Sequence, residues 1–344
     1  MKITTIKSSE LKKVTLFLID KKIIFHPIIS PNGIPDFSFY NNKDFILILD
    51  RNILVPILRL AEKGTLKDDF SLKLISSLLT WTEYNGVTIT AGLALMEYSH
   101  FKQGDNKSNI ENNVFLDIFK KINLSDWLNL AMGRTKTISP IKSRNIYKND
   151  FFIENDHFKM HYLEMLKISQ LYFDKNISVE NKFRLLFLWI YDNVLICKYT
   201  IFYSVFVFGE KSKIFRNANN DYEEIINKCT NQAWDLTYLS YWSSLYFNEN
   251  KSKEIFLFAT IDKELKNLFS ITYKDNLDIF TETFGLKTGK NIIENMNKTL
   301  LPREKPEIDS VKLDKMITDE KQKLKRILRH LTMHNQNCAF RKIE

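Results

Sequence analysis

The sequence predicts an α/β fold with a central, mainly parallel sheet, a large helical insertion and a helical C-terminal tail. Two short apolar runs, 45–49 and 255–261, are each followed at once by an acid and a helical pattern, which is typical of buried parallel strands. The long stretch between them is mostly helical in its periodicity. Glycine and proline number only 9 and 7, which disfavours a turn-rich β architecture. Strands at both ends of the chain therefore indicate one sheet whose halves are separated by the insertion.

Length and composition are sufficient for a large hydrophobic core. The 344 residues are 44% hydrophobic, so we expect one domain over 1–300, with the insertion at about 105–215, and a charged helical tail over 301–344. The three cysteines are far apart and without zinc-type spacing, and their odd number disfavours a disulfide framework. Residues 1–11 lack the apolar core of a signal peptide, so we expect a cytoplasmic protein. The net charge of +9 permits an anionic partner.

Apolar spacing and turn residues define the elements expected before residue 131. Gly64 ends one helix, and Leu72, Ile75 and Leu79 share one side of the next. The polar stretch 103–113 favours a loop. The expected elements, in order, are a hairpin over 14–26, a loop around Pro31, Gly33 and Pro35, a strand ending at Asp50, helices to about Lys63 and over 70–84, a short strand over 86–90, and helices over 91–99 and 114–130.

Helices dominate the elements expected after residue 150. The segment 183–208 is very apolar, but Arg184, Asp192 and Lys198 interrupt it. Charges near the centre of a membrane-spanning helix are costly, so we expect a buried helix that does not enter a membrane. The expected elements are helices over 156–173, 180–208, 222–247 and 263–269, a strand over 255–261, a final strand over 277–284 and the helical tail.

Asp50 is the first candidate functional residue, because it follows an apolar strand and precedes a helix. Open α/β sheets bind ligands at this carboxyl edge, although Asp is also a favourable N-cap and has that structural alternative here. Three more acids, Glu97, Asp235 and Asp262, lie in similar apolar surroundings. Burying several carboxylates without cations is unfavourable. A bound hard divalent cation such as Mg²⁺ or Mn²⁺ would compensate their negative charge.

Four short fragments around these acids resemble the motifs of the PIN-domain nuclease superfamily. That family's first motif resembles LDRNIL, its second GLALMEYS, its third QAWDLTYL and its fourth FATIDKEL. The resemblance covers about 43–100 and 221–285. The interval between the second and third acids is longer than is usual in the family, and Glu264 is the available stand-in for the extra acid that often follows the fourth motif. The matching residues are Asp50, Asn52, Glu97, Asp235, Thr260 and Asp262.

The resemblance implies a PIN-like three-layer domain and a metal-dependent ribonuclease, most often an endoribonuclease. Its implied substrate is RNA, or less often single-stranded DNA, and a toxin or defence role is common in the family. The two strand-end acids would be direct ligands of Mg²⁺ or Mn²⁺, and Asn52 and Thr260 would hydrogen-bond the carboxylates or the substrate phosphate. The implied catalytic and metal-binding residues are Asp50, Glu97, Asp235 and Asp262.

The alternative is a non-catalytic PIN-fold interaction protein that binds RNA or a protein through the helical insertion. Leu324 and Leu328 belong to an apolar stripe in the basic tail, which predicts docking on the domain, on a second subunit or on another protein, with RNA binding as the less favoured alternative. The segment 127–149 is basic and has no acid, so it is predicted either to contact phosphate or to be a solvated loop. His157 and His161 lack a third zinc ligand and are expected to be structural or at the surface.

Overall fold

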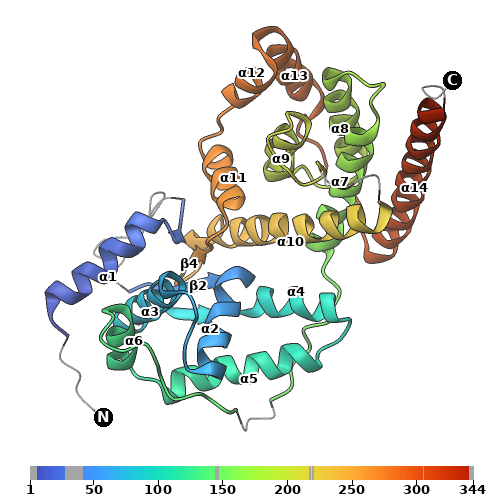
Figure 1. The fold of residues 1–344 in the computed structure, drawn as a ribbon. Helices are drawn as coiled ribbons and strands as arrows, with labels where there is room; N and C mark the ends of the chain where they lie inside the picture. The colour runs from blue at the N-terminus through green and yellow to red at the C-terminus, as the bar shows by residue number, and fades with distance from the viewer. Residues whose placement is uncertain are drawn as a thin grey trace. The chain divides into compact units, whose positions relative to one another are not determined.

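A computed structural model describes residues 6–27, 42–143, 147–216, 218, 221–304 and 306–340, with the backbone alone at 250 and 332–340. The chain forms two compact units (Figure 1). Unit 1 comprises Met1–Ile153 and Trp242–Lys266, and unit 2 comprises Glu154–Tyr241 and Asn267–Glu344. The stretch in which the sequence predicts a helical insertion, about 105–215, contributes helices to both units.

Unit 1 contains a four-stranded sheet in the order β1-β4-β2-β3. The central strand β2 runs parallel to β3 and to β4, and β1 is antiparallel to β4. In the register of β2 and β4, Asp44 pairs with Glu254 and Leu49 with Ala259. The expected α/β class and mainly parallel sheet are therefore confirmed. The strands are β1 (Ile24–Phe25), β2 (Asp44–Leu49), β3 (Thr88–Thr90) and β4 (Glu254–Ala259).

Strand β2 passes directly into the helix α2, which is the strand-to-helix transition that the sequence predicts. Helix α2 spans Arg51–Lys63, with Asp50 as its N-cap. It ends at Gly64, whose φ of +71° is a left-handed conformation that glycine adopts without strain. A Cβ atom at this position would also collide with the carbonyl oxygen of Ile138. Glycine is therefore required for both its backbone conformation and its lack of a side chain.

Five further helices pack around the sheet of unit 1 (Figure 1). Helix α3 contacts α1 and α6, and α5 contacts α2 and α4. One hydrophobic core joins these helices to the buried side chains of β2 and β4. The helices are α1 (Ser8–Lys21), α3 (Asp69–Tyr84), α4 (Gly92–Lys102), α5 (Asn106–Lys121) and α6 (Leu124–Ala131).

Three local predictions for unit 1 are wrong. One is the single helix expected over 114–130, which is divided into α5 and α6 where Ile122 becomes extended and Asn123 caps a new helix. The residues 14–21 belong to helix α1 rather than to a hairpin, because Val14 and Leu18 lie four residues apart and are both buried on one helical face. The expected loop 103–113 contains the first two turns of α5, in which some polar side chains are buried and hydrogen-bonded. Ser108, for example, donates to the carbonyl of Leu95 at 3.0 Å. The loop expected around Pro31, Gly33 and Pro35 lies outside the described residues.

Unit 2 is formed from helices. The predicted helix 180–208 is two helices, α8 and α9, because the chain becomes extended at Val194. The strand expected over 277–284 is also wrong, since this segment is the helix α12. The helices, of which α10 and α11 each also contribute residues to unit 1, are α7 (Asp156–Phe173), α8 (Val179–Asn193), α9 (Lys198–Phe208), α10 (Tyr222–Tyr246), α11 (Lys263–Tyr273), α12 (Asp278–Phe284), α13 (Leu286–Thr299) and α14 (Ser310–Phe340).

The charges that interrupt the apolar segment 183–208 lie on its solvent side. Arg184, Asp192 and Lys198 are exposed, whereas Phe183 and its apolar neighbours one and two turns along α8 are fully buried. None of the described helices is both long enough and apolar enough to span a membrane.

The tail helix α14 packs along α7 within unit 2 (Figure 1). Leu324 and Leu328, from the predicted apolar stripe, are both buried. Polar contacts reinforce the packing, because the side-chain amide of Gln170 donates to the carboxylate of Glu320 at 2.6 Å and to its carbonyl at 2.9 Å. The stripe is therefore covered by the chain's own helix.

His161 belongs to a buried polar network between helices of unit 2. Its Nδ1 lies 2.7 Å from Oε2 of Glu164, and its Nε2 lies 2.7 Å from Oγ of Ser240. The hydroxyl of Thr200 donates to the same oxygen of Glu164 at 2.5 Å. The network joins α7, α9 and α10, and it gives His161 a structural role.

We expect Thr200→Val to lower the free energy of unfolding by about 2 kcal/mol, because valine keeps the shape but leaves the buried Glu164 carboxylate with one donor fewer. Urea unfolding followed by circular dichroism measures this change. Thr237→Val is the matched control, since among the described residues the buried Thr237 hydroxyl bonds only the carbonyl of Ala233 in its own helix. An equal loss in the two variants would contradict a special role for the network.

Candidate functional site

Asp50 lies at the carboxyl end of β2 and caps α2. Its side chain accepts a hydrogen bond from the backbone N–H of Asn52 at 3.4 Å, as expected of an N-cap. It is nevertheless only 4% exposed, which is unusual for an acid whose sole purpose is to cap a helix. The capping alternative is therefore confirmed, and the functional alternative stays a prediction.

Asp262 occupies the equivalent place after the neighbouring strand β4. Its Oδ1 accepts hydrogen bonds from the backbone N–H groups of Glu264 and Leu265 at 2.7 and 2.9 Å, so it caps α11. Strands β2 and β4 are parallel and directly paired, and the N–H of Asp50 donates to the carbonyl of Ala259 at 3.0 Å. The two acids consequently leave the sheet side by side at its carboxyl edge.

Thr260 and Asn52 connect the two acids. The hydroxyl of Thr260 donates to Oδ2 of Asp50 at 2.5 Å, and it accepts from Nδ2 of Asn52 at 3.1 Å and from the N–H of Asp262 at 3.0 Å. Its one donor and two acceptor positions are thus all used. Asn52 also donates to Oδ2 of Asp50 at 2.5 Å and accepts from the N–H of Ile261 at 3.2 Å. This network fixes the orientation of the Asp50 carboxylate.

The electrostatic environment of Asp50 opposes its ionisation. Burial is the largest influence and raises the pKa of Asp50 from its ordinary value of 3.8 to about 6. The hydrogen bonds from Thr260 and from the Asn52 backbone lower the pKa, and the nearby charge of Asp262 raises it. A cation next to the two carboxylates would reverse this effect.

Each of the two carboxylates has an oxygen with few hydrogen bonds from the described residues. The hydrogen bonds that cap α11 both end on Oδ1 of Asp262. Oδ1 of Asp50 receives a long bond from the Asn52 backbone, and the Arg51 backbone also acts on this carboxyl. Two carboxylate oxygens with water or substrate phosphate in the remaining positions suit Mg²⁺, which seldom takes an all-protein ligand set. The donor set therefore fits a hard divalent cation.

The other two predicted acids occupy different surroundings. Glu97 is half-buried in α4, which follows β3 at the same carboxyl edge of the sheet, and Asp235 is half-buried in the part of α10 that belongs to unit 2. Within the ranges that the structure describes, no three His, Cys, Asp or Glu side chains are grouped closely enough to hold a metal ion. The convergence of all four acids on one metal stays a prediction.

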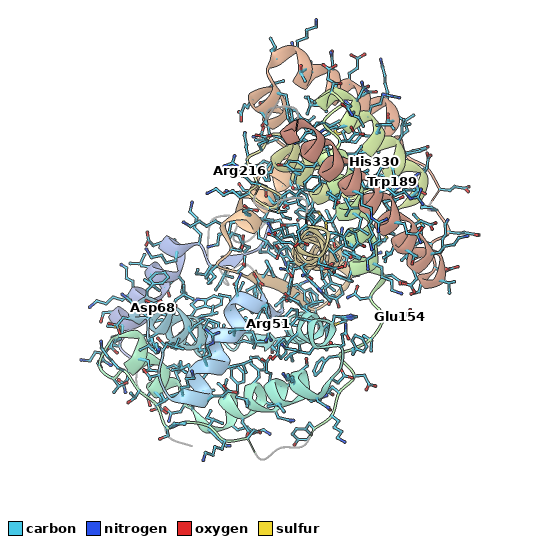
Figure 2. The ribbon with its side chains drawn as sticks, turned by 45° about the vertical axis from the view of Figure 1, so that its right-hand side comes forward. Arg51, Asp68, Glu154, Trp189, Arg216 and His330 are labelled. Atoms are coloured by element: carbon cyan, nitrogen blue, oxygen red, sulfur yellow. The ribbon has the colours of Figure 1, made fainter. Side chains whose placement is uncertain are left out.

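Arg51 is a neighbour of the acid pair that the sequence-based reasoning did not single out (Figure 2). Its guanidinium carbon lies 4.1 Å from the ring centroid of Tyr98, and its Nη2 donates to Oε1 of Glu111 at 2.9 Å. Arg51 therefore joins the start of α2 to α4 and α5. Its position directly after Asp50 was the available signal, but the partners are 47 and 60 residues away in the sequence.

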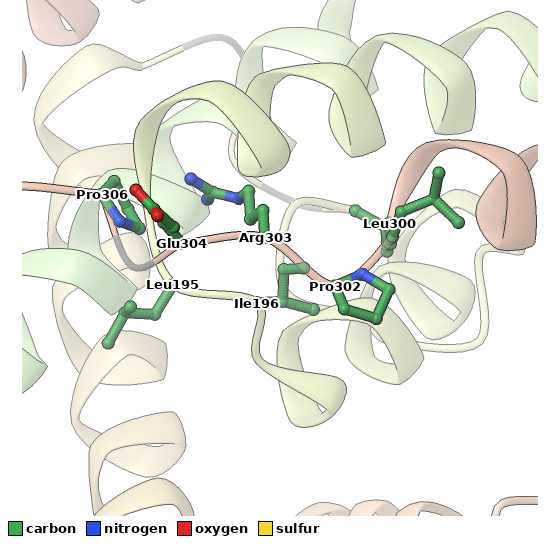
Figure 3. A pocket seen from close by; sticks show the side chains of 8 residues that line it. Leu195, Ile196, Leu300, Pro302, Arg303, Glu304 and Pro306 are labelled. Carbon is green, nitrogen blue, oxygen red and sulfur yellow. The ribbon is translucent and has the colours of Figure 1, made fainter.

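A separate pocket in unit 2 has a volume of about 470 Å³ (Figure 3). Arg303 lines it, but this guanidinium also donates to the carbonyl of Val194 at 2.7 Å and so holds two segments of chain together. None of the predicted acids lines the pocket. The lining residues are Leu195, Ile196, Leu300, Leu301, Pro302, Arg303, Glu304 and Pro306.

The basic segment 127–149 is partly ordered against α2. The N–H groups of Ile138 and Ile141 donate to the carbonyls of Gly64 and Ala61 at 2.8 and 2.7 Å. The sequence predicts either a phosphate-binding segment or a solvated loop, and neither alternative explains these two hydrogen bonds. The bonds also attach the segment to the end of α2.

The resemblance to PIN-domain nucleases stays a prediction based on short fragments. In the structure these fragments lie at the start of α2, in α4, in α10 and at the end of β4. In comparisons with known proteins, the chain matches no protein-family model, no curated protein and no solved structure.

Proposed function

We propose that the protein is a metal-dependent nuclease, most simply an endoribonuclease, whose cation binds at the carboxyl edge of the sheet in unit 1. The observation that supports this proposal is the pair Asp50 and Asp262 at the ends of two adjacent parallel strands. Thr260 and Asn52 hold this pair in a single hydrogen-bond network. The reaction class, nucleic-acid cleavage, is inferred from the resemblance of the surrounding fragments to PIN-domain motifs.

The residues of the site have distinct proposed roles. Asp50 and Asp262 bind the cation through their carboxylate oxygens, and Thr260 and Asn52 keep Asp50 in position. The resemblance implies that Glu97 and Asp235 complete or orient the site, but the proposal itself rests on the residues of unit 1 alone. When bound, Mg²⁺ or Mn²⁺ supplies an activated water and stabilises charge on the phosphate. Because the pKa of Asp50 is about 6, cation binding should weaken below that pH.

The test is cleavage of labelled single-stranded RNA and DNA by the full chain, with Mg²⁺, with Mn²⁺ and with a chelator. We expect cleavage of RNA that requires the metal. Asp262→Asn should lower the rate more than about 100-fold, since it removes a ligand charge. Asparagine caps helices as well as aspartate, so α11 should persist.

Asp221→Asn is the matched control for Asp262→Asn. Asp221 is exposed and accepts hydrogen bonds from the N–H groups of Glu223 and Glu224 at the start of α10. It therefore shares the capping role of Asp262, but it belongs to unit 2 and not to the unit that contains the sheet. Its replacement should leave cleavage unchanged. If the folded wild type cleaves neither substrate with either metal, the interaction-protein alternative replaces the nuclease.

A further inference from the structure

Helix α4 carries an exposed aromatic side chain beside a cation. Phe101 is 72% exposed, and Nζ of Lys102 lies 4.4 Å from its ring centroid. The same ammonium group lies 5.6 Å from the ring of Tyr98. Both distances are within the range of cation–π attraction. An aromatic ring this exposed contributes little to folding, so its placement calls for another explanation.

A segment of the same chain next to α4 carries a second exposed aromatic ring, and several contacts hold that ring in place. Phe152 is 49% exposed, and its ring centroid lies 5.0 Å from that of His100. Nε2 of His100 lies 2.9 Å from the carbonyl oxygen of Ile153. The carboxylate of Asp105 accepts hydrogen bonds from the N–H groups of residues 151 and 152. These contacts order the segment against α4.

We name this group the stacking surface, and it borders the proposed site. Arg51 directly follows Asp50 in the sequence. Glu97 is four residues before Phe101, so the side chains of Glu97 and Phe101 share one face of α4. The bidentate contact with Glu111 holds the Arg51 guanidinium in place next to Tyr98. The stacking surface consists of Arg51, Tyr98, Phe101, Lys102 and Phe152.

We propose that the stacking surface binds unpaired bases of a single-stranded nucleic acid, which is the form in which substrate reaches the acids. This inference rests on the proposed function for the identity of the substrate and goes beyond it by assigning the residues that recognise it. Aromatic rings stack on bases of any sequence, and interleaved cations neutralise the phosphates between them. In a duplex the base faces are already stacked, so a duplex should not bind in this way.

The lysine of the surface favours a nucleic acid over an apolar protein partner. Lysine is depleted in the cores of protein–protein interfaces, whereas here Nζ of Lys102 lies within 6 Å of the rings of Tyr98 and Phe101. The net charge of +9 points in the same direction.

The experiment measures binding in the presence of a chelator, where cleavage cannot interfere. Fluorescence anisotropy of a labelled single-stranded RNA gives the Kd of the wild type and of Phe101→Ala. We expect Phe101→Ala to raise the Kd about 10-fold and Phe101→Trp to restore it. Phe247→Ala is the matched control, because Phe247 is also in unit 1 and is 75% exposed. The Kd of this variant for the RNA should equal that of the wild type.

An abasic strand of equal length separates stacking from charge. The wild type should bind it about 10-fold more weakly than the RNA, and Phe101→Ala should cause no further loss. Lys102→Gln should weaken binding to both strands. The proposal is overturned if Phe101→Ala binds the RNA as tightly as the wild type, or if a duplex of the same sequence binds as well as the single strand.

The two proposals fail in different ways. If the RNA binds with the expected dependence on Phe101 but is never cleaved with metal, the stacking surface stands and the nuclease does not. If the RNA is cleaved while Phe101→Ala leaves both binding and cleavage unchanged, the nuclease stands and the stacking surface does not.

Discussion

Replacing Asp50 by asparagine is expected to abolish metal-dependent RNA cleavage, with a loss of at least about 10³-fold. Losing a residue that merely supports a metal ligand already costs about 10–100-fold, and Asp50 is proposed to be a ligand itself. Asparagine has nearly the same size, and its carbonyl oxygen can keep the bonds from Thr260 and Asn52 that end on Oδ2. The cation, by contrast, loses the negative charge of a residue that is only 4% exposed. The measurement is the single-turnover cleavage rate of labelled RNA with Mg²⁺.

Asp68→Asn provides the control for this variant. Asp68 (labelled in Figure 2) caps α3 by accepting hydrogen bonds from the N–H groups of Phe70 and Ser71, but it is exposed and no strand precedes it. Its replacement should leave the rate unchanged. Cleavage by folded Asp50→Asn at the wild-type rate would remove Asp50 from the proposed site.

Without metal, the wild type is expected to lose about 3 kcal/mol of stability between pH 4 and pH 7, because the Asp50 carboxyl must ionise while buried. Its pKa is raised from 3.8 to about 6 in the folded state, chiefly by burial. Each pKa unit corresponds to about 1.4 kcal/mol, and the shift is about two units. The folded state binds the extra proton in this interval, so stability falls as the pH rises through the folded-state pKa of about 6 and is constant above about pH 7.

Thermal unfolding in chelator, from pH 4 to pH 8, measures this effect. Asp50→Asn should not show the fall and should therefore be the more stable protein at pH 7.5. Mg²⁺ should stabilise the wild type above pH 6 and leave the variant unchanged. The stability difference between the wild type and Asp68→Asn should have the opposite pH dependence. Hydrogen bonds from Ser71 lower the pKa of Asp68, so the stabilising effect of its carboxylate is lost as the pH falls. If the stability of the wild type and of Asp50→Asn changed in parallel with pH, the pH effect could not be assigned to ionisation of the buried Asp50 carboxyl.

Features with a strong local signal could be predicted from the sequence. The Ile- and Leu-rich run before Asp50 and the aromatic run before Thr260 become β2 and β4, because buried parallel strands are apolar on both faces. The helix beginning after Asp50 and ending at Gly64 is also predicted, since capping and stop signals act within a few residues. The strand-end position of Asp50 and Asp262 follows from these local patterns alone.

Other features depended on the tertiary structure. The hairpin expected over 14–26 is mostly helix, because Val14 and Leu18 find a buried site on one helical face, and local alternation cannot reveal that site. The bond from Thr260 to Asp50 joins residues 210 apart and exists because β2 and β4 pair in parallel. That pairing also places the charge of Asp262 near Asp50. Burial in the folded protein is the main cause of the raised pKa of Asp50. The sequence by itself determined which residues end the strands, whereas long-range packing decided which of them meet and how strongly they interact.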